Sequence, residues 1–323
     1  MSSPIASFLR RLAALCLLAW AGNAAAQAGT VRLIVAAPPG GITDVFARLL
    51  AEPLQAQLKQ AVIVDNKPGG SGAIAMRALL SAPANGLTLL LATPTSLTLP
   101  PLLKEPAVFD PRRDVLPVAR IAGGGGLLVV PSSLPVNSVQ ELVAYAKARP
   151  GQLNFGSAGN ASSNHLAMEL FRDRLGLDIV HVPYSGAVPA INGLLSGQVQ
   201  VYMGDLGSLE PQLRAGRLRA LAQIGSERSP LYPYLPTLGE GLLPGYQATF
   251  WLGIVAREGT PAAAVGRLNA AVNAAMATEA PRRHAATIGF AVHQGPPKDL
   301  ADTIDSDLTV WGDVIRKHHI TAP

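Results

Sequence analysis

The sequence contains a single cysteine, Cys16, which lies in an apolar stretch near the N-terminus. Leu15 precedes it where lipid attachment would need a small residue, so the sequence does not favour a lipoprotein anchor. If the first 26 residues are removed, no cysteine remains, and a hydrophobic core rather than disulfides must stabilise the fold. The 297 residues that are left, 323 minus 26, are enough for two domains of about 150 residues each.

Aromatic residues are few, at 5% of the chain, and charged residues make up only 15%. Lys and Arg are scattered, and no basic run offers a stripe for phosphates. The net charge of +5 falls to +3 when Arg10 and Arg11 are removed. This composition argues against nucleic acid as a partner, while the mild positive balance slightly favours anionic ligands through electrostatic steering.

Long hydrophobic runs are also missing. The apolar stretch from Leu12 to Trp20 is much shorter than the roughly 20 residues that span a bilayer. Two arginines precede it and Ala24 to Ala26 follows it, which is the pattern of a secretory signal peptide. We predict a signal peptide over residues 1–26, cut before Gln27, with Ala26-Gln27-Ala28 as a second cleavage pattern. The mature protein is then expected to be soluble and periplasmic.

Motifs for catalysis and cofactor binding are missing as well. No glycine run carries the Gly-Lys-Ser/Thr of a phosphate loop, and Gly123 to Gly126 leads into a strand where a dinucleotide site needs a helix. His318 and His319 are adjacent on a predicted helix, so their rings diverge, and no cluster has metal-ligand spacing. We therefore predict no enzyme activity, no cofactor and no metal.

One catalytic alternative stays open at this point. Ser71 lies in a Gly-Gly-Ser-Gly-Ala segment, which loosely resembles the nucleophile elbow of a hydrolase. Under this hypothesis the protein would be a periplasmic serine hydrolase that uses Ser71.

What the chain has instead is an apolar, strand-like segment that runs into a glycine- or serine-rich turn and then into an amphipathic helix. The pattern occurs three times, most clearly over Val31 to Leu50, and the other turns are Asp65 to Gly72 and Gly156 to Ser163. Free N–H groups at a helix start, together with the positive end of the helix dipole, form a seat for an anion such as a carboxylate. Several such seats on one exported chain indicate a receptor for a small acid.

Strands and helices alternate along the chain, which predicts parallel sheets with crossover helices. The predicted strands are Val31–Ala36, Ala61–Val64, Leu87–Ala92, Val118–Val130, Leu153–Phe155, Ile179–Val182, Val199–Met203, Leu218–Ile224 and Tyr246–Ala256. The predicted helices are Thr43–Leu58, Ala73–Leu80, Val139–Ala148, Asn164–Leu175, Val188–Leu195, Leu209–Leu213, Ala262–Met276 and Asp299–His318. Pro53 is expected to interrupt and kink the first helix, and residues 100–118, rich in proline and charge, are expected to form a loop.

Two of the predicted strands, over 118–130 and 246–256, are placed to cross between domains. The predicted fold is therefore α/β, with a first lobe over residues 27–122 and 247–323 and a second lobe over 123–246. The final helix is expected to pack on the first lobe. The two chain segments that cross between the lobes are expected to form a hinge.

Three turns and one strand end carry the candidate binding residues. Pro39 to Asp44 and Gly69 to Gly72 follow predicted strands, at the edge where α/β sheets bind ligands, and Thr43 or Asp44 is placed to cap its helix. Ser157 to His165 gathers hydroxyl, amide and imidazole groups within nine residues, and Asp205 ends another strand. Each feature also has a structural interpretation as a connecting turn, an N-cap, a hydrogen-bonded histidine or an exposed carboxylate, and the residues alone leave both open.

Six segments, in order, resemble the tripartite tricarboxylate transporter receptors, also called Bug proteins. They are VRLIVAAPPGGITDVFARLLAEPLQAQLKQAVIVDNKPGGSGAIAM, LTLLLAT, NFGSAGNASSNHLAMELF, DIVHVPYSGAVPAINGLLSGQVQVYMGD, LRALA and FWLGIVAREGTPAAAVGRLNAAV, and they cover almost all of the mature chain. The resemblance implies a two-lobed periplasmic solute-binding protein of the type II, Venus-flytrap kind, with a parallel-rich sheet and flanking helices in each lobe. Such a protein passes a carboxylated compound to membrane permease subunits or to a sensor kinase. We expect a monomer whose ligand is an organic acid, an acidic amino acid or an aromatic acid.

In that family, backbone N–H groups and ordered water from loops of both lobes hold the carboxylate of the ligand. Carried over by motif, the resemblance implies ligand contacts in the first lobe from Gly40, Gly41, Thr43, Asp44, Gly70, Ser71, Gly72, Thr93 and Thr95. In the second lobe it implies contacts from Ser157, Gly159, Asn160, Ser162, His165, Tyr184 and Asp205, with Asp205 reading the distal part of the ligand. Ile42 stands where the family usually has a third glycine, and Pro53 is unusual in the helix behind it. Both departures bear on which acid is bound.

Overall fold

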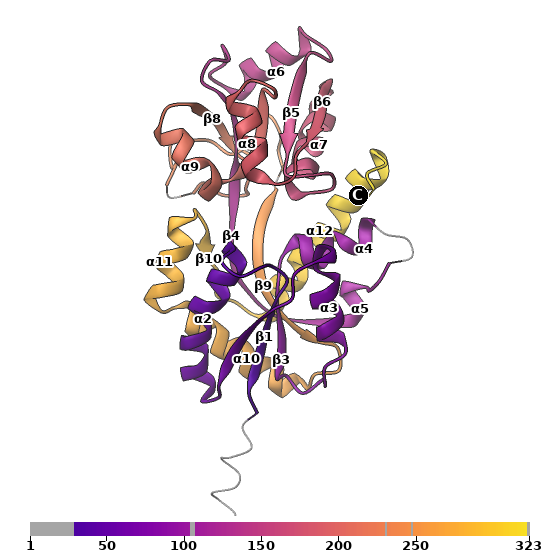
Figure 1. Ribbon diagram of the computed structural model, residues 1–323, viewed down its shortest axis with the longest axis vertical. Helices are drawn as coiled ribbons and strands as arrows, with labels where there is room; N and C mark the ends of the chain where they lie inside the picture. The colour runs from indigo at the N-terminus through magenta and orange to yellow at the C-terminus, as the bar shows by residue number, and fades with distance from the viewer. Residues whose placement is uncertain (1–28, 104–106, 230, 247, 322–323) are drawn as a thin grey trace, which may run out of the picture.

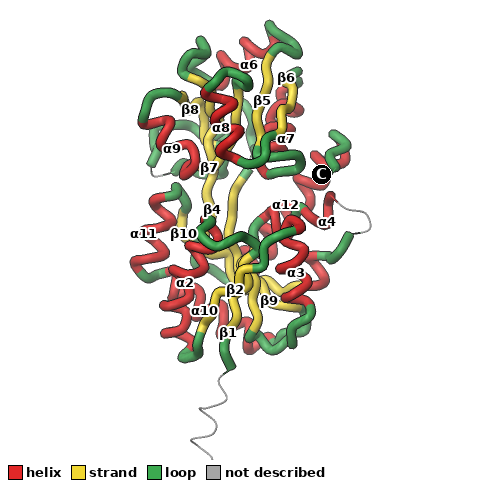
Figure 2. The backbone as a smooth tube through the Cα atoms, viewed as in Figure 1, coloured by secondary structure: helices red, strands yellow, loops and turns green. Residues whose placement is uncertain are grey.

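The computed structural model describes residues 29–103, 107–229, 231–246 and 248–321, so the predicted signal peptide lies outside the described residues. Figure 1 shows an elongated molecule with two bodies stacked along its long axis. Two strands run through the waist between them, β4 (Val115–Pro131) and β9 (Thr249–Arg257), as the strand colouring of Figure 2 also shows. Among the residues that the structure describes, no helix combines the length and the apolar character needed to cross a bilayer.

The first lobe is the body built around β1 (Val31–Val35), β2 (Val62–Asn66) and β3 (Thr88–Ala92). These strands are parallel in the order β2-β1-β3, and β9 continues the sheet antiparallel to β3, followed by β4 and the short β10 (Ala291–Val292). The helical elements of this lobe are α2 (Ile42–Leu58), η1 (Gly70–Gly72), α3 (Ala73–Leu80), η2 (Pro94–Thr98), α4 (Pro100–Leu103), α5 (Pro111–Asp114), α10 (Ala262–Met276) and α11 (Glu279–Thr287).

The second lobe is the body built around β5 (Leu153–Ser157), β6 (Ile179–Pro183), β7 (Val201–Asp205) and β8 (Leu218–Gln223). It repeats the plan of the first: β5 lies between β6 and β7 and is parallel to both, and β4 joins β7 in the antiparallel direction, with β8 also antiparallel to β4. Its helices are α6 (Val139–Lys147), α7 (Ser163–Leu175), α8 (Ala187–Leu195) and α9 (Leu206–Arg214). The α/β class and the two-lobed architecture predicted from the sequence are thus confirmed.

Helix α2 shows how packing overrides a local signal. The predicted interruption at Pro53 is wrong, because one helix continues through this residue to Leu58. Phe46 and Leu50 before the proline and Leu54 after it are fully buried in the core of the first lobe. Burial of this stripe on both sides of Pro53 offsets the backbone hydrogen bond that the proline removes, at a cost of about 3 kcal/mol.

Other differences concern segments with a weak sequence pattern. The predicted loop over 100–118 contains α4, α5 and the start of β4, because Pro111 begins α5 and the Asp110 side chain accepts a hydrogen bond from the N–H of Arg112. The sequence analysis misses α11 and β10, which have few apolar residues on which a period could be recognised.

The final helix, α12 (Pro297–Lys317), packs on the first lobe as predicted and also contacts the second lobe. Its first half packs Leu300, Ile304 and Leu308 into a core of the first lobe. Its second half packs Trp311 and Ile315 with residues of the second lobe, and the helix contacts α7 there. Figure 1 shows this helix running from the lower body to the upper one, where the chain ends.

Candidate functional site

A cavity of about 340 Å³ lies between the two lobes. Six of the residues predicted from the sequence line it: Thr43, Ser71, Gly72, Thr93, Thr95 and Asp205. The other lining residues are Ala36, Ala37, Ile42, Gly69, Leu91, Pro94, Ser96, Ser163, Phe250, Trp251, Leu252 and Phe290. Segments far apart in the sequence therefore meet where the strand ends of the first lobe face the second lobe.

The start of α2 opens into the cavity without a side-chain cap. Gly41 is the N-cap residue, and no side chain accepts a hydrogen bond there, so the predicted capping by Thr43 or Asp44 is wrong. Ile42 and Thr43, the first residues of the helix, line the cavity. Their N–H groups have no partner within the helix and are available to an anion.

Asp44 supports this loop from behind and is only 2% exposed. Its carboxylate accepts hydrogen bonds from the Gly40 N–H at 2.9 Å, from Arg48 Nε at 3.0 Å and from Asn66 Nδ2 at 2.8 Å. Arg48 first, and then the Gly40 N–H, lower the pKa of Asp44 to about 2. Asp44 thus fixes the loop that contains Gly40 and Gly41 and does not itself line the cavity.

The second glycine turn has an unusual backbone. The φ angles of Gly69, Gly70, Ser71 and Gly72 are 112°, 58°, 51° and 90°, all in the region that favours glycine. Gly72 is required for a second reason, because a Cβ atom on it would lie 2.6 Å from Ser96 Cα of the η2 turn. The turn leads into α3, where the N–H groups of Gly72 and Ala73 donate to the carbonyls of Gly69 and Gly70, so the turn itself, through Gly69, Ser71 and Gly72, lines the cavity.

The η2 turn closes this side of the cavity and caps itself. Thr93 Oγ1 accepts a hydrogen bond from the Ser96 N–H, and Ser96 Oγ accepts one from the Thr93 N–H at 3.0 Å. These two reciprocal hydrogen bonds form a capping box that holds Thr93 and Ser96 in place. Thr95 is exposed and lines the cavity.

From the second lobe, Asp205 reaches the cavity at the end of β7. Its Oδ1 accepts a hydrogen bond from the Ser208 N–H at 2.8 Å, and its Oδ2 accepts one from the Ser208 hydroxyl at 2.9 Å. Asp205 is therefore the N-cap of α9, held by two bonds to one residue.

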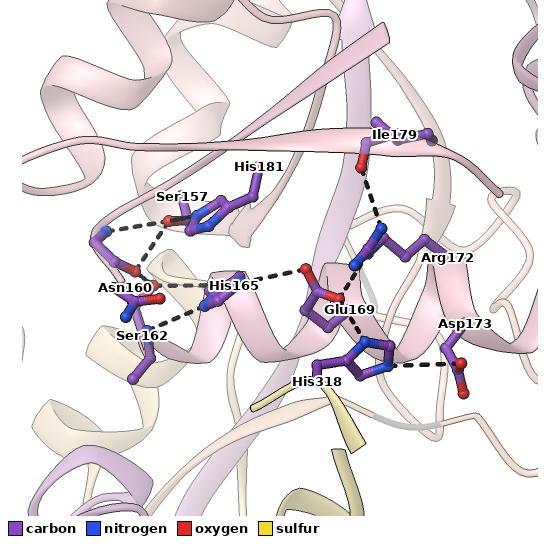
Figure 3. A network of polar contacts seen from close by, with 12 residues as sticks. Ser157, Asn160, Ser162, His165, Glu169, Arg172, Asp173, Ile179, His181 and His318 are labelled. Atoms are coloured by element: carbon purple, nitrogen blue, oxygen red, sulfur yellow. Dashed lines mark hydrogen bonds and ion pairs between the residues drawn. The ribbon is translucent and has the colours of Figure 1, made fainter. Parts of the chain in front are cut away.

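The turn from Ser157 to Ser162 lies beside the cavity, which only Ser163 of this region lines. Ser157 Oγ is 2.7 Å from His181 Nε2 and also bonds the backbone of Gly159, while Ser162 caps α7 (Figure 3). Asn160 Nδ2 donates a hydrogen bond to the Thr321 carbonyl at 2.7 Å. In this structure these side chains hold the turn in shape and present the start of α7.

Behind that turn, polar contacts continue along α7 to the end of α12 (Figure 3). The His165 ring accepts the Ala161 N–H and stacks on His181, with centroids 3.7 Å apart. Burial first, and then His165, lower the pKa of His181 to about 4. His165 also contacts Glu169, and Glu169 contacts His318 beyond the end of α12.

Glu169 holds a negative charge in this buried network. Burial raises its pKa, but hydrogen bonds from His165 and Arg172 outweigh burial, and the pKa is lowered. Arg172 Nε donates to Glu169 at 2.6 Å, and His318 also approaches Asp173. The turn from Ser157 to Ser162 is thus connected through side chains to α12, whose first half packs in the first lobe.

Tyr184 is held outside the cavity lining. Its hydroxyl donates to Gln198 at 3.1 Å, and its ring packs on Gly193 of α8. The sequence analysis, in turn, misses the apolar lining residues Phe250, Trp251 and Phe290. Their only signal was the position of the first two on a strand expected to cross between lobes.

Two lobes joined by crossing strands, with helix starts gathered around the cavity between them, define a two-lobed ligand-binding protein. The chain belongs to the TctC family, described as the tripartite tricarboxylate transporter family receptor, which matches residues 46–320. The receptors of this family are periplasmic binding proteins. The resemblance to Bug proteins seen in the sequence is confirmed.

Three relatives illustrate the membership. The protein BugT of Bordetella pertussis (strain Tohama I) is 34% identical over 288 residues, which cover 89% of this chain and 88% of BugT. The structure of Rpa4515 from R. palustris with adipate is 34% identical, with a TM-score of 0.76, and covers 91% of this chain and 99% of that one. MatC (Rpa3494) from Rhodopseudomonas palustris, with bound malate, is 30% identical, with a TM-score of 0.72, and covers 90% and 99% of the two chains.

The comparisons support a receptor and not the serine hydrolase hypothesis, because the family is one of solute-binding receptors.

Proposed function

We propose that this protein is a periplasmic receptor that captures a small carboxylated compound between its lobes. One observation carries the proposal: the uncapped start of α2, with Ile42 and Thr43, and the Gly69 to Gly72 turn line one cavity between the lobes. Relatives that share the fold and about a third of the residues hold adipate or malate, which supports a carboxylate as the ligand.

In this mechanism the carboxylate binds first to the N–H groups at the α2 start and the Gly69 to Gly72 turn. Hydrogen bonds to a charged acceptor are stronger than neutral ones, so no Lys or Arg partner is needed. Rotation of the second lobe then brings Ser163 and the start of α7 against the ligand. Because only the closed form makes contacts from both lobes, the ligand shifts the population toward it.

We assign the lobes to residues 27–122 with 247–323, and to 123–246, joined by β4 and β9 as the hinge. The ligand-binding residues predicted in the sequence but not in the cavity lining, such as Gly159 and His165, would act by holding the second-lobe turn. Export through a signal peptide over 1–26, action as a monomer, and delivery to permease subunits or to a sensor kinase complete the proposed function.

Calorimetric titration of the mature protein with monocarboxylates, dicarboxylates and tricarboxylates tests the proposal. At least one acid should bind with micromolar affinity, about −8 kcal/mol, and be recovered unchanged. The variant Ala37→Trp fills the cavity and should abolish binding, whereas Ala56→Trp, on the exposed face of α2, should not. If no acid binds, or if both variants bind as the parent does, the proposal is refuted.

A further inference from the structure

We propose that the cavity selects an acid with one carboxylate and an apolar ring, and that Asp205 excludes acids with a second carboxylate. This inference rests on the proposed function, since it specifies which carboxylates the same cavity accepts. Its arguments are the charge of the lining, the fixed position of Asp205 and the chemistry of the wall that faces it.

The charge of the lining favours a single anionic group. Of the 18 described residues that line the cavity, none is Lys, Arg or His, and Asp205 is the one with a charged side chain. A first carboxylate is stabilised by the N–H groups at the α2 start and in the Gly69 to Gly72 turn. A second carboxylate placed away from that seat would have no cation to meet in the lining, and it would lie in the field of Asp205.

Asp205 also occupies the N-terminus of α9, which is then not available to bind an anionic ligand. The positive end of α9 faces this region, but the Asp205 carboxylate already caps it through Ser208. The two hydrogen bonds, to the backbone and to the hydroxyl of the same serine, hold the carboxylate in place. Thus the second lobe presents a fixed negative group to the cavity. Without the Asp205 carboxylate, the N-terminus of α9 would be an anion-binding site.

The wall contributed by the hinge is apolar and aromatic. The chain has only 16 aromatic residues among 323, yet Phe250, Trp251 and Phe290 are among the 18 that line the cavity. Trp251 donates its indole N–H to Asp307 at 2.9 Å, away from the cavity residues, so this N–H is not free for a ligand. Phe250 and Phe290 are only partly buried and can still cover a ligand. Ile42 and Leu252 extend the apolar surface.

An apolar ring suits this wall better than an extended polar chain. Aromatic rings stack or pack edge to face with phenylalanine, and burial of the ring surface adds to the hydrogen bonds of the carboxylate. The relative that holds adipate shows that the fold accepts a dicarboxylate, so the expected preference depends on the lining residues of this chain.

The test compares ring monocarboxylates with dicarboxylates, and one pair differs by a single carboxylate alone. Calorimetry measures the affinity of the mature protein for benzoate against benzene-1,4-dicarboxylate, and for cyclohexanecarboxylate against adipate and malate. We expect each ring monocarboxylate to bind at least tenfold more tightly than its dicarboxylate counterpart. Tighter binding of the dicarboxylates overturns the inference but leaves the proposed function intact, whereas no binding by any acid overturns both.

The role of Asp205 is tested by Asp205→Asn, in which the amide oxygen can still cap α9. The ratio of benzoate to benzene-1,4-dicarboxylate affinity should fall at least tenfold in this variant. Asp302→Asn, which removes an exposed carboxylate of α12 paired with Lys298, should leave the ratio as it is. Phe290→Ala should weaken benzoate at least tenfold, with unfolding curves recorded for each variant to verify the fold. An unchanged ratio in Asp205→Asn contradicts the assignment of Asp205.

Discussion

At the scale of single residues, two buried carboxylates experience opposite surroundings. Asp44 receives hydrogen bonds from a cationic side chain, an amide and a backbone N–H, and its pKa is lowered to about 2. Asp307 on α12 is 8% exposed, and burial raises its pKa to about 6 although Trp251 and Thr98 donate hydrogen bonds to it. The folded state therefore favours the ionised form of Asp44 and the protonated form of Asp307.

Asp44→Asn should destabilise the protein by about 2 kcal/mol at pH 7, because buried hydrogen bonds to a charged group are lost. A lowered pKa means that the contribution of Asp44 is present above pH 3.8 and is lost as the pH falls toward about 2. Urea unfolding at pH 7 and pH 3 should show the difference between parent and variant shrinking in acid. Glu52→Gln, on the exposed side of α2, is the control and should change little. Equal stability of parent and Asp44→Asn at pH 7 would contradict the role given to Asp44.

Asp307→Asn should act in the other direction. The raised pKa means that stability from Asp307 is full below pH 3.8 and is lost as the pH rises through about 6. The neutral amide avoids the buried charge, so the variant should exceed the parent at pH 8 by up to about 3 kcal/mol, and the gain should vanish near pH 4. Urea unfolding at the two pH values checks this, and a variant less stable than the parent at pH 8 would refute it.

The cavity-lining residues could be predicted from the sequence where they lie on one turn. The strand-to-turn pattern located Thr43, Ser71 and Gly72 because a glycine turn after a buried strand must lie at the sheet edge. The pattern could not show that the Asp44 side chain points toward the loop and not into the cavity. Hydrogen bonds from Asn66 and Arg48 set the direction of this side chain. Phe290 was missed because only the tertiary fold brings it to the cavity.

At the scale of elements, His165 of α7 and His181 of β6 form a stack of two imidazole rings, and the pKa of His181 in it is lowered. His181 is partly buried, His165 lies against its face, and the charges of Glu169 and Arg172 are close. The depressed pKa predicts that His181 stays neutral until the pH falls to about 4. Its contribution to stability is then present above the usual pKa of 6.5 and is lost as the pH falls toward 4.

The prediction for His181 is checked by NMR titration of the histidine side-chain signals. The His181 signal should move with a midpoint near pH 4, and its assignment follows from loss of the signal in His181→Gln. The same variant should unfold with a weaker dependence on pH between 6.5 and 4 than the parent. A His181 midpoint near pH 6.5 would contradict the buried stack.

The helices and strands were largely predictable because their apolar periods are long. Ala73–Leu80 and Ala262–Met276 have the predicted bounds, since each begins beside a turn signal and carries a clear apolar stripe. The short strand β10 was not predictable, because its two pairs, Ala291 with Gly123 and Val292 with Ala122, depend on β4. Long-range pairing of this kind leaves no local pattern.

At the scale of the whole molecule, the glycines of β4 at the waist allow backbones to pack directly on one another. A Cβ on Gly126 would lie 2.0 Å from the carbonyl oxygen of Gly204, and one on Gly125 would lie 2.5 Å from the nitrogen of Gly225. The close approach of these strands at the hinge therefore excludes any side chain at either position.

Gly126→Ala should accordingly destabilise the protein by about 3 kcal/mol, because backbone atoms must move to admit the methyl group. Gly266→Ala is the matched control, since nothing lies within 4 Å of a Cβ at this position of α10 and its backbone is helical. The control should stabilise the protein by about 0.5–1 kcal/mol. Urea unfolding of both variants checks the pair, and similar effects of the two substitutions would contradict the packing argument.

Helix α12, with its first half in one lobe and its second half against the other, has a practical consequence. Trp20 lies in the predicted signal peptide, which leaves Trp251 in the cavity wall and Trp311 where the helix passes between the lobes. Both indoles lie at the junction of the lobes, which the proposed closure would rearrange. The unlabelled protein therefore carries its own fluorophores with which the proposed motion can be tested optically, without introducing a dye.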